Sequence, residues 1–370
     1  MQAGEARNTS AFIQTNERSL KKLLVIVALV VIGGGIWIGW GIRAPYRGYA
    51  ASVLITVPAR SNARAAAGIL ASHGVLRDQA PFLALYIFGR TQGRTLKAGE
   101  YLFDRPLSAR QVYWKLVRGD VYYHMVVIPE GSDRFDMARI FQQKLGLNPV
   151  DFLSATAHAD LIGDLDPNAA TLEGYLFPDT YRFPASTTAA SAVQTMVERF
   201  RHVIGPKLGQ IPDGSSLHDV LTLASLVEKE TPDPPERPEI AGVFTRRLER
   251  GMSLDCDPTV RYAARLAAEP SLLLDPAPAP ITAAELSSPS PYNTYRHVGL
   301  PPGPICSPGA ASIDAALHPA EGDSLYFVSN LHGGHVFAKT LDEHNRNVAR
   351  YRRQLAASAS QNDTSARSRR

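Results

Sequence analysis

The longest apolar run of the chain lies near its beginning. Residues 23–42 read LLVIVALVVIGGGIWIGWGI and contain no charged side chain. Twenty helical residues at 1.5 Å each span about 30 Å, the thickness of the hydrocarbon core of a bilayer. Trp37 and Trp40 lie near one end, where interfacial aromatic side chains gather. The pattern predicts an uncleaved transmembrane helix. The alternative is a buried core helix, for which the glycines at 33–35 are poorly suited.

A strand–helix pattern follows the short linker at 43–52 and occurs twice. The copies, VPARSNARAAAGILASHGVL and IPEGSDRFDMARIFQQKLGL, begin at Val57 and Ile128, 71 positions apart. Each predicts a strand, a proline turn and an amphipathic helix. A unit of about 45 residues is too small to be very stable alone. We therefore expect the copies to pack on each other or on a larger domain.

These patterns predict an α+β protein with one N-terminal transmembrane helix, a small α/β module and a larger mixed α+β domain. The expected boundaries are a cytoplasmic tail at 1–22, the transmembrane helix at 23–42, the module at 53–125, the second repeat unit at 126–164, the large domain at 165–352 and a disordered tail at 353–370. Within the large domain, we expect helices at 191–203, 217–231, 236–250, 310–318 and 340–353, strands at 325–330 and 335–339, and a loop at 265–290.

The net charge of +4 is confined to the two ends of the chain. Residues 1–22 and 355–370 each carry a net charge of +2, so the body between them is neutral. This distribution argues against a nucleic-acid partner, which would require a basic folded face. Four basic residues precede the apolar run and only Arg43 and Arg47 follow it closely. This bias favours a cytoplasmic N-terminus and places the rest of the chain, after the apolar run, outside the cytoplasm.

The chain has two cysteines, Cys256 and Cys306. Outside the cytoplasm such a pair can be oxidised, which would close a loop of about 50 residues and add roughly 4 kcal/mol. Two unpaired, buried thiols are an equally good interpretation. The cysteine spacing and the ten histidines form no recognisable metal motif, so no metal site is predicted.

The first candidate for chemistry is the aromatic stretch TLEGYLFPDTYRFP at 171–184. If it is extended, Glu173, Tyr175, Asp179 and Tyr181 share one face. Aromatic faces beside carboxylates suit sugar rings. The alternative is a strand that buries its aromatic side chains in a core.

The second candidate is the end of the helix predicted at 217–231. Glu228 and Glu230 lie in its last turn, at the negative end of the helix dipole, before Pro232. Glu230 lies four positions after Leu226 and three after Val227, which both belong to the apolar stripe of this helix. Apolar burial and the dipole both raise a carboxyl pKa, as a general acid at neutral pH requires. The alternative is a solvated helix end.

Two further stretches are polar and turn-rich. The string DPTV contributes Asp257 and Thr259. The string YNTY, in a proline-rich loop, contributes the candidate binding residues Tyr292, Asn293, Thr294 and Tyr295. A rigid polar and aromatic loop suits an extended polar ligand better than a core.

Together these stretches resemble the endolytic murein transglycosylase family (MltG/YceG-like). The resemblance covers the chain from the apolar run to about residue 352. Its most specific strings are EG at 173–174 with PDTY at 178–181, VEKET at 227–231, DPTV at 257–260, YNTY at 292–295 with GLPPG at 299–303, and GGH at 333–335.

The resemblance implies a membrane-anchored enzyme with a small LysM-like module and an external catalytic domain. It implies endolytic cleavage of the MurNAc–GlcNAc β-1,4 bond in peptidoglycan glycan strands, giving 1,6-anhydro-MurNAc ends, beside membrane-bound synthases at the inner membrane. The catalytic acid would be Glu230, and no cofactor is needed. The substrate-binding residues would be Glu173, Tyr175, Asp179, Tyr181, Glu228, Asp257, Thr259, Tyr292, Asn293, Thr294, Tyr295 and His335. A muramidase-type hydrolase and a non-catalytic wall-binding scaffold are the alternatives.

Overall fold

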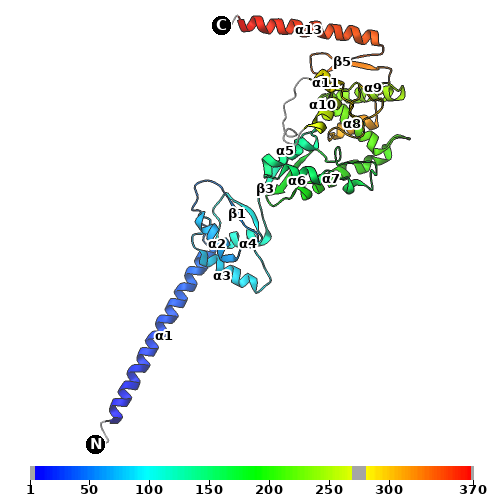
Figure 1. The fold of residues 1–370 in the computed structure, drawn as a ribbon. Coiled ribbons are helices and arrows are strands. Elements are labelled where there is room, and N and C mark those ends of the chain that lie inside the picture. The colour runs from blue at the N-terminus through cyan, green and yellow to red at the C-terminus, as the bar shows by residue number, and fades with distance from the viewer. Residues whose placement is uncertain (1–4, 269–280, 368–370) are drawn as a thin grey trace. The chain divides into compact units, whose positions relative to one another are not determined.

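The computed structural model describes residues 5–268 and 281–367. The chain divides into two compact units, the first up to Tyr123 together with residues 184–186, and the second made of the remainder from His124 onward. Each unit has its own apolar core. Figure 1 follows the elements along the chain.

Helix α1 (Glu5–Arg43) contains the apolar run. Its stretch Lys21–Arg43 is long and apolar enough to cross a membrane, and none of its most apolar window is buried inside the protein. Leu29, Val30 and Ile36 are each more than 60% exposed. This exposure argues against the alternative of a buried core helix.

The first unit contains the first copy of the predicted repeat. Strand β1 (Val53–Val57) pairs antiparallel with β2 (Gly99–Phe103), with Ile55 opposite Tyr101. Helices α2 (Ala63–Ser72), α3 (Gln79–Arg90) and α4 (Ala109–Arg118) begin at side-chain caps, namely Asn62, Asp78 and Ser108. Such caps satisfy backbone N–H groups that the first helical turn leaves free.

The second copy of the repeat forms part of the larger core. Strand β3 (Tyr123–Val127) pairs with β4 (Thr180–Pro184), and helix α5 (Arg134–Leu145) follows the proline turn. Phe135 and Phe141 share their core with residues of α6 (Pro149–Ala155), α7 (Ala189–Ile204) and α8 (Leu217–Glu230). The expectation that this copy packs on the larger domain is confirmed, because a single core joins them.

Helix α8 packs against both α9 (Arg237–Glu249) and α12 (Ala310–Leu317). Helix α10 (Asp257–Ala267) contacts α8 and the short α11 (Ala283–Leu286). Strands β5 (Tyr326–Ser329) and β6 (His335–Ala338) form an antiparallel hairpin that contacts α13 (Leu341–Arg367). Short 3₁₀ turns occupy Asp160–Ile162, Gly205–Gln210 and Pro234–Glu236.

Three predicted segments differ from the structure. The stretch 171–184 is extended only from Thr180, because Gly174 adopts a φ of +87° and Pro178 has no N–H for a ladder. Helix α13 continues to Arg367, where a disordered tail was predicted from residue 353; alanines in this segment favour a helix even without an apolar stripe. The predicted loop at 265–290 includes the end of α10 and all of α11, and its part at 269–280 lies outside the described residues.

Candidate active site

The site is built around the last turn of α8. A capping box between Ser216 and Asp219 starts this helix, and its buried residues from Leu217 to Val227 fix its position in the core. The helix ends at Glu230 because Thr231 is extended, as expected for a residue that precedes proline.

Glu230 is partly exposed at this end, and its carboxylate accepts a hydrogen bond from the thiol of Cys256. Burial raises the pKa of Glu230, and the negative charge of Asp257 raises it further. The Cys256 hydrogen bond and the nearby His335 act in the opposite direction but do not cancel the effect of burial. The arrangement therefore favours a protonated carboxyl that solvent or a ligand can reach.

Glu228 has a different environment, although it is only two residues away. Its Oε1 lies 3.0 Å from Nη2 of Arg237, and its Oε2 accepts a hydrogen bond of 2.9 Å from the backbone N–H of Gly309. Both side chains of this ion pair are about 6% exposed. Gly309 is the N-cap of α12, so the carboxylate also meets the positive end of that helix. Glu228 thus ties α8, α9 and α12 together, and its predicted direct contact with substrate is not supported.

His335 approaches the end of α8 from β6. Its Nδ1 lies 2.8 Å from Oε2 of Glu236, and its backbone N–H donates to Oε1 of the same carboxylate at 2.7 Å. Thr231 also donates to Glu236 at 3.3 Å. This carboxylate therefore joins the start of β6 to the residue that follows Glu230, and the histidine lowers its pKa.

The DPTV and YNTY strings meet at Cys256. The hydroxyl of Thr294 accepts a hydrogen bond of 3.0 Å from the Cys256 N–H and lies 2.9 Å from the hydroxyl of Thr259. Thr259 donates in turn to the Cys256 carbonyl at 2.7 Å. Both threonines are buried, so they hold the backbone of Cys256 rather than offer a binding surface. Their predicted role as substrate-binding residues is corrected accordingly.

Tyr295 and Asp257 are the exposed part of the same junction. The Tyr295 hydroxyl donates to Oδ1 of Asp257 at 2.6 Å, and its side chain is 40% exposed. Asn293 is fully buried and donates to the carbonyls of Leu286 and Ser288, so it shapes the loop instead of lining a groove. The predicted loop residues therefore separate into exposed and structural members.

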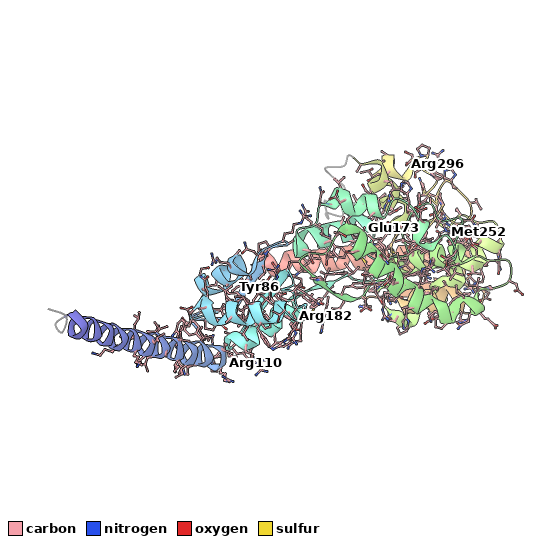
Figure 2. The ribbon with its side chains drawn as sticks, turned by 90° about the horizontal axis from the view of Figure 1, so that it is seen from below. Tyr86, Arg110, Glu173, Arg182, Met252 and Arg296 are labelled. Atoms are coloured by element: carbon pink, nitrogen blue, oxygen red, sulfur yellow. The ribbon has the colours of Figure 1, made fainter. Side chains whose placement is uncertain are left out.

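Glu173, labelled in Figure 2, is 3% exposed. Hydrogen bonds place it in a buried polar cluster. Its Oε2 accepts hydrogen bonds from the Arg134 N–H at 3.2 Å and the Tyr262 hydroxyl at 3.0 Å. Among the residues that the structure describes, its Oε1 has no hydrogen-bond partner. Burial raises the pKa of Glu173 to about 8, and the charge of Asp133 contributes in the same direction. Tyr292 is partly buried and packs edge-on against Tyr262, with ring centroids 5.1 Å apart.

Tyr175 and Tyr181, in the aromatic stretch at 171–184, do not form an exposed face. Tyr175 is buried and donates to Asp166, while Tyr181 donates to the Phe177 carbonyl at 2.6 Å. Both rings belong to the core, which is the alternative that the sequence had left open. Asp179 pairs with Arg199 at 2.7 Å. The proposed sugar-binding face of Tyr175 and Tyr181 is therefore wrong, because both rings are buried in the core.

The disulfide alternative is also not realised. Cys256 and Cys306 are both buried free thiols, and burial raises the pKa of each well above its ordinary value. Cys306 contacts the Ser225 carbonyl, with Sγ 3.4 Å from the oxygen, on the preceding part of α8. In residues 5–268 and 281–367, no three His, Cys, Asp or Glu side chains gather as a metal site would require.

Three contributors to the site escaped prediction, namely Glu236, Arg237 and the thiol of Cys256. Glu236 and Arg237 hold His335 and Glu228, but neither stands in a periodic pattern that singles it out. The role of Cys256 was missed because two cysteines in an external domain first indicate a disulfide. The sequence feature that points to Glu236 and Arg237 is the proline-rich string after Glu230. It predicts that the chain turns back sharply toward the end of the helix.

The comparisons with known proteins identify the family. The YceG-like family profile matches residues 55–350. The chain is 30% identical to an endolytic murein transglycosylase of Bacillus subtilis (strain 168) over 340 residues, covering 87% of this chain and 91% of that protein. It is equally similar to an endolytic murein transglycosylase of Streptococcus pneumoniae (strain D39) over 329 residues, covering 81% of this chain and 58% of that protein.

A solved structure agrees with this result. The crystal structure of a yceG-like protein from Listeria monocytogenes superimposes with a TM-score of 0.54 at 30% identity, covering 80% of this chain and 98% of that one. Sequence and structure therefore lead to the same conclusion. The chain belongs to the YceG-like family, whose named relatives in B. subtilis and S. pneumoniae are endolytic murein transglycosylases.

Proposed function

We propose that this protein is a membrane-anchored lytic transglycosylase that cleaves the MurNAc–GlcNAc β-1,4 bond within peptidoglycan glycan strands. The observation that carries the proposal is the environment of Glu230, a reachable carboxyl whose pKa is raised by burial. A general acid needs a proton at neutral pH, and an ordinary solvated glutamate does not keep one. The names of the relatives supply the substrate class.

In the proposed reaction Glu230 acts twice. Its proton goes to the glycosidic oxygen as the bond to C1 of the muramyl sugar breaks through an oxocarbenium-like state. The resulting carboxylate then takes the proton of the C6 hydroxyl of the same sugar. The C6 oxygen attacks C1 and closes a 1,6-anhydro ring, which regenerates the acid. Because the nucleophile is intramolecular, correct placement of the sugar replaces the activation of a water.

Asp257 and Tyr295 are exposed polar groups that are hydrogen-bonded to each other, and the charge of Asp257 acts on the reacting carboxyl. We assign them to orienting the sugar and to stabilising positive charge at C1. Asp257 is suited to this role because its charge already influences Glu230. His335, held by Glu236, lies near the same carboxyl and would help to position it.

The remaining parts of the proposal concern location and partners. We place α1 across the inner membrane with its N-terminus in the cytoplasm, on the basis of its apolar run and the excess of preceding basic residues. We assign the first unit as a LysM-like module. We further propose that the substrate is nascent glycan made by membrane-bound synthases, since the anchor would hold the site near them.

The main rival is a muramidase-type hydrolase. Asp257 is the observation that favours it, because hydrolases use a second carboxylate to activate water or to attack C1. Mass spectrometry of glycan strands digested by the full chain in detergent separates the two. A transglycosylase gives anhydro ends, whereas a hydrolase gives reducing ends heavier by one water. Reducing ends as the dominant product would refute the transglycosylase, and intact strands would favour a wall-binding scaffold.

A further inference from the structure

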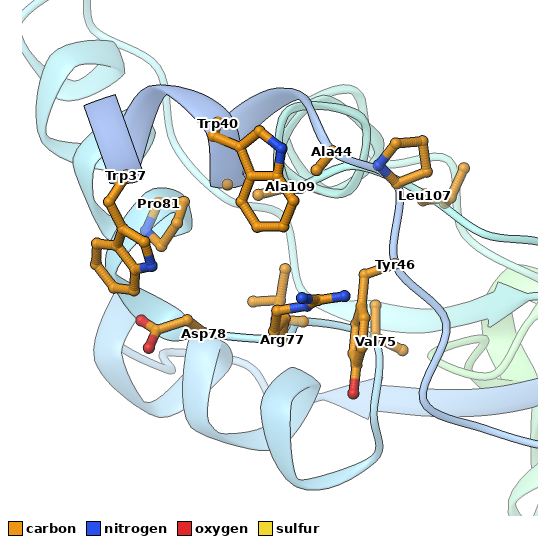
Figure 3. A pocket seen from close by; sticks show the side chains of 13 residues that line it. Trp37, Trp40, Ala44, Tyr46, Val75, Arg77, Asp78, Pro81, Leu107 and Ala109 are labelled. Atoms are coloured by element: carbon orange, nitrogen blue, oxygen red, sulfur yellow. The ribbon is translucent and has the colours of Figure 1, made fainter. Parts of the chain in front are cut away.

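The first unit contains a hollow where it meets the end of α1 (Figure 3). It holds about 100 Å³, roughly the space of three water molecules. Trp37 and Trp40 line it from α1, Arg77 and Asp78 line it from just before α3, and Pro81 lines it from the first turn of α3. The lining is therefore mostly apolar, and Arg77 and Asp78 are its charged members.

The hollow lies at the point along α1 where this helix approaches α3 closely. A Cβ atom on Gly41 would come within 2.7 Å of Cγ of Pro81, so only glycine allows α3 to pack this closely. Helix α1 also packs against α4. The hollow therefore lies at the level where the apolar span ends, and in a bilayer this is the headgroup region.

The guanidinium of Arg77 lies over two aromatic rings, and it has no acidic partner among the described residues. Its guanidinium carbon lies 5.4 Å from the ring centre of Trp40 and 5.1 Å from that of Tyr46. The nearby Asp78 carboxylate is engaged as the N-cap of α3, where it accepts from the Ala80 N–H at 2.7 Å. Within the described part of the chain, no ion pair involves Arg77. Stacked rings orient the guanidinium, and its edge keeps N–H donors for an anion.

Helix α3, which contributes Pro81 to the hollow, also carries exposed apolar side chains. Ile87 and Phe88, near the end of this helix, are 66% and 63% exposed. Large apolar side chains exposed on a helix that packs against a membrane span suit the boundary between headgroups and acyl chains.

We propose that this hollow binds the phosphate of an anionic phospholipid, with Arg77 as its donor and the acyl chains left in the bilayer. A volume of about 100 Å³ suits a phosphate group and excludes a whole lipid. Guanidinium groups bind phosphate through paired N–H donors. The inference rests on α1 spanning a membrane and does not depend on Glu230 or on glycan cleavage. Such a site would fix the height and tilt of the first unit on the membrane.

Native mass spectrometry of the full chain in detergent tests this proposal. The probes are phosphatidylglycerol, diacylglycerol with the same chains, and glycerol phosphate without chains. We expect Arg77→Ala and Arg77→Gln to weaken phosphatidylglycerol binding at least tenfold. Arg64→Ala removes an exposed arginine from α2 of the same unit and should have no effect. Unchanged thermal unfolding of the Arg77 variants verifies that they fold.

Three outcomes would overturn the proposal. The first is equal lipid binding by the Arg77 and Arg64 variants, which would show that the hollow is not the site. The second is equal binding of diacylglycerol, which would show that the phosphate is not recognised. The third is displacement of the lipid by an equal concentration of glycerol phosphate, which would indicate a site for soluble phosphate compounds.

Discussion

Replacing Glu230 by glutamine will lower the rate constant for glycan cleavage by about 10²–10⁴-fold, the usual contribution of a general acid. Glutamine keeps the size and hydrogen-bonding capacity of the side chain but has no proton to give to the glycosidic oxygen. Binding of glycan should remain, because the exposed Asp257 and Tyr295 are untouched. The measurement is release of soluble fragments from purified strands by the full chain in detergent, together with a glycan pulldown.

The matched control is Glu249→Gln. Glu249 is also the last residue of a helix, α9, but it is exposed. Its replacement makes the same chemical change at an exposed helix end and should leave cleavage unchanged. Cleavage at the wild-type rate by Glu230→Gln would remove Glu230 from the mechanism.

The stability of the second unit will fall as the pH rises from about 4.5 to about 8, and Glu173→Gln will remove much of this slope. The folded state keeps a proton on Glu173 up to a pKa of about 8, while the unfolded chain loses it near the ordinary glutamate pKa of 4.5. Between these values the unfolded state binds fewer protons, so stability decreases with pH. The shift corresponds to about 4–5 kcal/mol.

Urea unfolding of the full chain in detergent at a series of pH values measures this effect. Asp133 and Glu230 also have pKa values raised by burial, so part of the slope will remain in the variant. Glu249→Gln again serves as the control, because an exposed glutamate should not alter the slope. A wild-type stability that is flat or increases between these pH values would contradict the buried, protonated state of Glu173.

The helices of the second unit were predictable because their apolar periodicity records which side faces the core. The helix predicted at 217–231 is observed as Leu217–Glu230, and the one predicted at 191–203 is observed as Ala189–Ile204. The assignment of aromatic residues was harder. A period of two would put Tyr175 and Tyr181 on one face of an extended segment, but it predicts neither where that segment begins nor whether a core or a ligand meets the face.

Local sequence patterns also predicted only part of the candidate active site. The sequence indicated Glu230 because helix end, apolar stripe and proline coincide there. It could not distinguish Glu228 from Glu230, since the difference depends on Arg237 and Gly309, which approach from other elements. The contact between Cys256 and Glu230 likewise joins segments 26 residues apart. Contacts of this kind depend on tertiary packing, which local patterns do not record.

The central claim is that Glu230 holds a proton at neutral pH until glycan arrives. The most direct measurement is carbon NMR of the full chain in detergent with glutamate side-chain carboxyls labelled, using Glu230→Gln to assign the signal. The account predicts a titration midpoint for Glu230 clearly above the ordinary value of about 4.3. A midpoint near that ordinary value, both in the free protein and with glycan bound, would contradict it.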